Sequence, residues 1–187
     1  LSVGSERDQR RLVGTRIKNY RIDRFVGQNN VAAVYKATEL PLDRIVALKI
    51  MHPNLAAEEA RKQRFLQESR MLSRLDHPNI IRVLSYDNVD NELFMVMEYV
   101  AGPSLRKNIA DTKAANKQFA VKDAVNLVIQ IADGLQYAHQ QGMIHRSLKP
   151  ENVVLRQSAV IGPIVSYTPV MTDFSVAQFS ESGEIFI

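Results

Sequence analysis

The sequence predicts an α+β protein in two parts, an antiparallel five-stranded sheet with one helix followed by a mainly helical part. Short runs of alternating apolar and polar residues dominate the first hundred positions, which is typical of half-buried strands. Helical spacing of apolar residues occurs there once and prevails after residue 104. With 187 residues, 45% hydrophobic and 24% charged, the chain suits one soluble globular domain or two small lobes.

The expected strands are short and separated by turn-forming residues. They cover residues 20–26, 31–37, 44–51, 80–86 and 92–99. Pro41 and Pro53 bracket the third strand, which is rich in β-branched residues, as a central strand should be. The turn 27–30 makes a hairpin of the first two strands.

A helix is expected over residues 56–75, with Phe65, Leu72 and Leu75 on its apolar stripe. Glu68 lies in the same stripe, where a carboxylate is costly unless it is paired. Lys49 lies on the predicted central strand and has the same difficulty. The sequence therefore predicts a buried Lys49–Glu68 ion pair, and a purely structural salt bridge is the alternative interpretation.

The domain organisation follows from changes in composition. Residues 1–18 are polar and unpatterned, so we expect a flexible leader and structure from about Tyr20. Residues 19–100 form the first lobe, and the Gly and Pro of 100–104 indicate a hinge. Residues 101–187 form a second, incomplete lobe with helices expected from Ser104 to Ile109 and over 122–141.

Composition excludes several classes of function. The chain has no Cys, so disulfides, thiolate metal sites and Cys nucleophiles are excluded. Its net charge of +4 comes partly from an N-terminal basic cluster, which we interpret as a solvated tail and not as a nucleic-acid-binding arm. No apolar run is long enough to span a membrane, and we expect a cytoplasmic location.

Four motifs in order resemble those of the protein kinase family, from about Tyr20 to the last residue. They are a glycine-containing loop at 27–34, Val-Ala-Leu-Lys at 46–49, His-Arg-Ser-Leu-Lys-Pro-Glu-Asn at 145–152 and Asp-Phe-Ser at 173–175. The resemblance implies the bilobal kinase fold with an incomplete helical lobe. It also implies ATP and Mg²⁺ as ligands, and a protein substrate or partner.

The resemblance also implies a role for each matching residue. Lys49, paired with Glu68, contacts the phosphates, Lys149 faces the transferred phosphate, and Asn152 and Asp173 hold the metal. The remaining positions form the loop over the phosphates and the adenine pocket: Gly27, Val34, Ala47, the gatekeeper Met97, the backbone of Glu98 and Val100, and Val154. For the apolar members of this set, an ordinary hydrophobic core is the alternative.

Several residues depart from the family pattern. Ser147 stands where the family has the Asp that accepts the hydroxyl proton, and a neutral hydroxyl in its place predicts a rate loss of roughly 10² to 10⁴. Asn29 and Ala32 replace glycines of the phosphate loop, which predicts a looser or differently shaped lid. Ser175 replaces the Gly of the metal-binding triplet.

The prediction is therefore an ATP- and Mg²⁺-binding kinase-like domain whose transfer chemistry is impaired, a pseudokinase with a regulatory or binding role. A weakly active Ser/Thr protein kinase is the first alternative, and an interaction fragment that binds no nucleotide is the second. Because the chain ends shortly after the triplet, we expect it to be cut from a longer protein.

Overall fold

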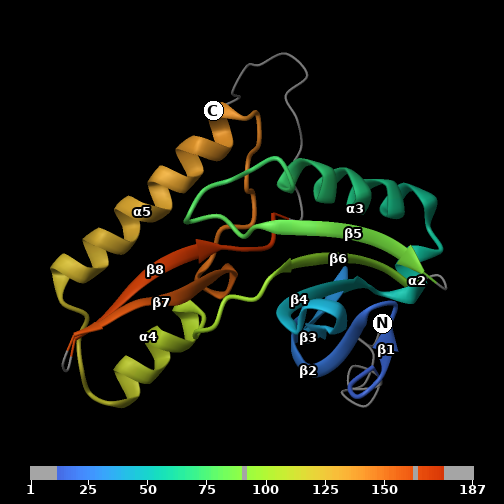
Figure 1. Cartoon of the computed structure of the whole chain (residues 1–187). Helices are drawn as coiled ribbons and strands as arrows, with labels where there is room; N and C mark the ends of the chain where they lie inside the picture. Colours follow the sequence, from blue (N-terminus) through green and yellow to red (C-terminus); the bar gives the residue numbers. More distant parts are fainter. Residues whose placement is uncertain (1–11, 90–91, 162–163, 175–187) are drawn as a thin grey trace. The chain divides into compact units, whose positions relative to one another are not determined.

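The computed structural model of the chain describes residues 12–89, 92–161 and 164–174 (Figure 1). The expectations for residues 1–11 and for Ser175 lie outside this part. The chain divides into two compact units. The first unit comprises residues 1–73 and 83–99, and the second comprises residues 74–82 and 100–187.

A six-stranded antiparallel sheet forms most of the first unit (Figure 1). Its order is β1-β2-β3-β4-β6-β5, so β3 and β4 are the central strands. The strands are β1 (Arg16–Ile17), β2 (Tyr20–Gln28), β3 (Ala32–Glu39), β4 (Arg44–Met51), β5 (Val83–Val89) and β6 (Glu92–Glu98). The five predicted strands are thus present. The structure adds the short strand β1 and the 3-10 turn η1 (Leu40–Leu42), which lies between β3 and β4.

Regular structure begins earlier than the predicted start at Tyr20, because strand β1 precedes that residue. Ile17 and Tyr20 are buried, and the Tyr20 ring meets Phe94 edge to face at 6.0 Å between centroids. Lys18 in the β1–β2 turn forms an ion pair with Asp87 of β5, although β1 and β5 are opposite edges of the sheet. The sheet therefore curls until its two edges approach each other.

Two helices follow β4, where one was expected over residues 56–75. The single turn α2 (Pro53–Ala56) precedes α3 (Glu59–Leu72), and extended backbone at Glu58 separates them. Helix α3 buries Phe65, Ser69 and Leu72 and runs along β5, where Arg70 Nε donates to Tyr86 Oη at 3.2 Å (Figure 1).

The described residues of the second unit form two helices and a pair of antiparallel strands (Figure 1). The helices are α4 (Leu105–Ala114) and α5 (Val121–Gln140). The predicted cap of α4 is confirmed, since Ser104 Oγ accepts a hydrogen bond from Lys107 N. Strands β7 (Val153–Ile161) and β8 (Ile164–Met171) pair after the 3-10 turn η2 (Pro150–Asn152).

Close packing positions this pair of strands. A Cβ on Gly134 of α5 would lie 2.6 Å from Met171 Cε, so α5 approaches β8 closely at this point. A Cβ on Gly102, in the predicted hinge, would lie 1.9 Å from Leu155 O.

No helix in the described part of the chain combines the length and apolarity that crossing a bilayer requires.

Two local expectations are corrected. The strand expected over 80–86 begins only at Val83, because Ile81 N donates to Met171 O at 2.9 Å and Met171 N to Asn79 O at 2.8 Å, both within the second unit. The second unit also contains a pair of strands beside its helices. Its residues 153–161 and 164–171 pair as antiparallel strands with one register shift, a pairing that the sequence pattern had not indicated.

Candidate active site

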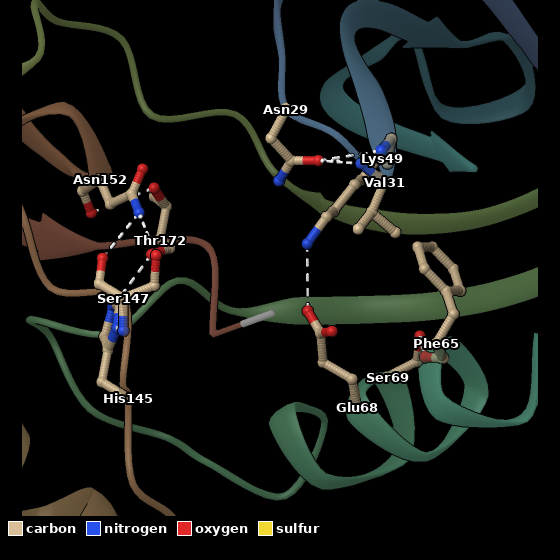
Figure 2. A network of polar contacts seen from close by, with 11 residues as sticks. Asn29, Val31, Lys49, Phe65, Glu68, Ser69, His145, Ser147, Asn152 and Thr172 are labelled. Atoms are coloured by element: carbon tan, nitrogen blue, oxygen red, sulfur yellow. Dashed lines mark hydrogen bonds and ion pairs between the residues drawn. The ribbon is translucent and has the colours of Figure 1, made fainter. Parts of the chain in front are cut away.

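The first part of the site is an ion pair between strand β4 and helix α3. Lys49 Nζ lies 3.0 Å from Glu68 Oε1, and the two side chains are only 5% and 11% exposed (Figure 2). Lys49 points inward because β4 is central, and Glu68 because it follows Phe65 by one turn of α3. The predicted pair is confirmed, and its burial strengthens the attraction between the charges.

Strand register places other predicted residues beside this pair. Val34 of β3 is opposite Lys49, and Ala47 of β4 is opposite Met97 of β6. Ala47 and Met97 are buried, whereas Val34 and Glu98 are half-buried. The sheet thus brings the candidate adenine-pocket residues of the first unit onto three adjacent strands.

The β2–β3 turn corresponds to the predicted phosphate loop. Asn29 Oδ1 accepts hydrogen bonds from Val31 N at 2.8 Å and Ala32 N at 2.9 Å (Figure 2). Neither Asn29 nor Ala32 has a positive φ, and Gly27 has none either. The expectation for this turn was a looser or differently shaped lid, and the structure shows a turn closed by its own hydrogen bonds.

In the second unit, Ser147 and Asn152 contact each other (Figure 2). Asn152 Nδ2 donates to Ser147 O at 2.8 Å and to Ser147 Oγ at 3.2 Å. Asn152 is buried in η2, and its carbonyl accepts from Thr172 N at 2.8 Å. These bonds hold the 147–152 loop to the residue that precedes Asp173.

His145 is a packing residue. Its ring lies 4.2 Å from the Phe174 ring between centroids. Since the Thr172 carbonyl accepts, His145 Nε2 must donate to it, at 3.1 Å, while Nδ1 accepts from Ser147 N at 3.3 Å. Burial lowers the pKa of His145, and its hydrogen bonds and the Asp173 charge oppose that effect only in part.

Acidification should therefore destabilise the fold through His145. The unfolded chain takes up a proton near the usual pKa of 6.5, whereas the folded imidazole resists it, so the free energy of unfolding falls as pH drops below 6.5. The slope for one such group is at most about 1.4 kcal/mol per pH unit. Urea unfolding between pH 7.5 and 5 should show this decline.

The matched variants separate this effect from general acid sensitivity. His145→Gln cannot titrate and should flatten the decline, whereas His139→Gln, which removes an exposed imidazole from α5, should retain it. An unchanged decline in His145→Gln would contradict the assignment.

The remaining predicted residues of the second unit lie in several settings. Asp173 is half-buried and has a φ of +60°, a left-handed conformation that turns the chain between Thr172 and Phe174. Lys149 is exposed, whereas Val100 is half-buried. Val154 is half-buried in β7, opposite Val170.

Comparison with known protein families extends the resemblance to almost the whole chain. The family described as "Protein kinase domain" matches residues 20–185. The chain belongs to the protein kinase family.

Curated relatives of this kinase chain include bacterial enzymes. It is 34% identical over 166 residues to serine/threonine-protein kinase pkn3 of Myxococcus xanthus, which covers 88% of this chain and 29% of the relative. It is 35% identical over 175 residues to serine/threonine-protein kinase PrkC of Bacillus subtilis (strain 168), covering 93% and 25%. The chain thus spans less than a third of the length of either relative.

Solved kinase domains agree with the fold. The crystal structure of the Mycobacterium tuberculosis PknI kinase domain superposes with a TM-score of 0.69 and 30% identity, covering 89% of this chain and 63% of that chain. The predicted kinase-like fold class is confirmed.

Sequence reasoning missed one residue beside the candidate site residues in each unit. Thr172 joins the loop to the triplet, because its N and Oγ1 donate to Asn152 O and its carbonyl accepts from His145. His52, after β4, donates from Nε2 to Asn29 O at 2.9 Å. Neither residue had a local signal in the sequence.

Proposed function

We propose that the chain is an ATP- and Mg²⁺-binding protein kinase domain whose phosphoryl transfer is impaired, and that it acts as a regulatory or binding module. Nucleotide binding rests on the Lys49–Glu68 pair, and impaired transfer rests on Ser147. Its substrate or binding partner would be another protein.

The buried Lys49–Glu68 pair is the observation that carries the proposal. Two charges that are 5% and 11% exposed have lost most of their hydration, and such a pair often stabilises a fold no better than apolar residues would. An additional use for the ammonium therefore accounts for its presence. In this family that use is binding nucleotide phosphates, with the glutamate orienting the lysine.

The donor set also suits magnesium. Asn152 Nδ2 is engaged by Ser147, so Oδ1 is the atom of that amide that can ligate a cation, and Asp173 supplies a carboxylate. The described residues contain no cluster of three His, Asp or Glu side chains. Two oxygen donors suit Mg²⁺, which keeps waters and substrate phosphates as its other ligands. The ion would neutralise phosphate charge there.

Ser147 is the basis for impaired transfer. In transfer, the bond from the γ-phosphorus to ADP breaks, a bond to the substrate hydroxyl forms, and the hydroxyl proton passes to a base. Ser147 Oγ carries no charge and accepts a hydrogen bond from Asn152. It is a poor proton acceptor near neutral pH, so this chain orients ligands better than it moves the proton.

Calorimetry with ATP and Mg²⁺ tests nucleotide binding. We expect a measurable, magnesium-dependent affinity that Lys49→Met lowers roughly 10- to 100-fold, because one charge-assisted hydrogen bond to phosphate is lost. Lys107→Met is the matched control. It removes a surface lysine that pairs with Asp111 of the same helix, and the affinity should not change.

Two results would overturn the proposal. The first is no ATP binding by the folded chain, which would favour an interaction fragment that binds no nucleotide. The second is equal ATP affinity of the parent and of Lys49→Met, which would mean that the Lys49–Glu68 pair does not contribute to nucleotide binding.

A weakly active Ser/Thr protein kinase is the second candidate. The observations that favour it are Lys149, which is retained and exposed, and the names of the curated relatives, which are serine/threonine-protein kinases. Positioning and charge neutralisation supply much of phosphoryl-transfer catalysis, so some turnover is compatible with the loss of the base. Transfer of radiolabelled phosphate that depends on Lys49 would support this candidate.

A further inference from the structure

The β2–β3 turn uses its own backbone donors. Asn29 N donates to Ala32 O at 3.0 Å, and the N–H groups of Val31 and Ala32 both donate to the Asn29 carboxamide oxygen, at 2.8 and 2.9 Å. One side-chain oxygen thus collects two backbone donors at the tip of the hairpin (Figure 2).

A second contact holds the turn in this state. His52, just after β4, donates from Nε2 to Asn29 O and from its backbone N to Val31 O, both at 2.9 Å. Ala32, on the other side of the turn, is buried. The backbone of Asn29 is therefore fixed from outside the turn while its side chain closes the turn from within.

The occupied donors lie where this family binds phosphate. Strand pairing places Val34 opposite Lys49 and Ala32 opposite Met51, so the turn continues directly from the strand beside the phosphate-binding lysine. Loops of this kind bind anions by aiming backbone N–H groups at them. An amide oxygen and a phosphate oxygen are both hydrogen-bond acceptors, and they compete for the same two donors.

We propose that the Asn29 carboxamide is an internal competitor for phosphate at this turn, so that it sets the chain's preference between nucleoside and nucleoside triphosphate. The inference rests on the proposed nucleotide binding and adds a determinant of its selectivity. Phosphates reach the Val31 and Ala32 donors only after the Asn29 side chain has left them. Adenosine has no phosphate and avoids this cost.

Calorimetry with two ligands tests the inference. We expect Asn29→Ala to bind ATP with Mg²⁺ about 10-fold more tightly than the parent, since two modest hydrogen bonds no longer have to be broken first. Its affinity for adenosine should stay within about twofold. Asn19→Ala is the matched control, because it changes an exposed asparagine in the β1–β2 turn, outside the phosphate loop, and both affinities should remain those of the parent.

A second variant tests the same competition in the opposite direction. Asn29→Asp keeps an oxygen that accepts both N–H groups and adds a negative charge, so it should weaken ATP binding about 10-fold or more and leave adenosine binding unchanged. It also retains the closed turn, which makes it the safer variant if Asn29→Ala does not fold.

The outcomes separate this inference from the proposed function. If the parent binds both ligands and Asn29→Ala binds ATP no more tightly, or if ATP and adenosine respond alike, the inference is wrong while nucleotide binding stands. If Asn29→Ala binds ATP more weakly, the carboxamide helps the phosphates and the inference is also wrong. If neither ligand binds to the parent or to any variant, both proposals fail.

Discussion

Ser147→Asp should raise phosphoryl transfer by roughly 10²- to 10⁴-fold, the gain expected from a positioned general base. The Ser147 side chain already has a defined partner, since Asn152 Nδ2 donates to its oxygen at 3.2 Å. An aspartate there has two oxygens. One can keep the Asn152 bond, and the other can accept the proton of a substrate hydroxyl. Transfer of radiolabelled γ-phosphate to a generic basic protein is the measurement.

The controls for this variant separate charge from shape. Ser147→Asn has nearly the size of aspartate but no negative charge, so it should stay at the parent rate. Adding Lys49→Met to Ser147→Asp should abolish the gain if the activity belongs to this site. If Ser147→Asp still binds ATP but transfers no faster, the impairment does not lie at Ser147. If the parent transfers phosphate as fast as Ser147→Asp, the chain needs no base at position 147.

Glu68→Ala should cost about 3–5 kcal/mol in the free energy of unfolding, because it leaves the Lys49 ammonium buried without its carboxylate partner. That ammonium is on the central strand β4 and its side chain is only 5% exposed, so solvent compensates little. The midpoint of urea unfolding, followed by circular dichroism, measures the loss.

Two matched variants show whether the loss comes from the stranded charge. The double variant Lys49→Met/Glu68→Leu removes both charges and should recover most of the stability. Glu58→Ala breaks the Glu58–Arg61 pair at the start of the same helix, where both side chains are more than half exposed, and should cost at most about 1 kcal/mol. Equal losses in Glu58→Ala and Glu68→Ala would contradict the view that burial sets the cost.

Nearly all of the sheet and the polar centre of the first unit could be predicted from local pattern. Strand β4 matches its predicted bounds, because an apolar, β-branched run between two prolines has few alternatives. Lys49 and Glu68 were paired correctly because each charge lay on a face that had to be buried, and the penalty for an unpaired charge there exceeds any local preference. The four motifs then indicated the family, which the comparison confirms.

What the sequence alone determined were features set by neighbours along the chain: the periodicity of strands and helices, the family motifs and the replacement at Ser147. Only the tertiary structure decided which distant groups meet. Ile81 N donates to Met171 O, so β5 begins only at Val83, and residues 153–161 pair with residues 164–171. His52 donates to the Asn29 carbonyl in the β2–β3 turn. The physical reason is that a backbone N–H or a side-chain amide can form hydrogen bonds with many partners of equal chemistry, and only the folded chain brings one of them within 3 Å.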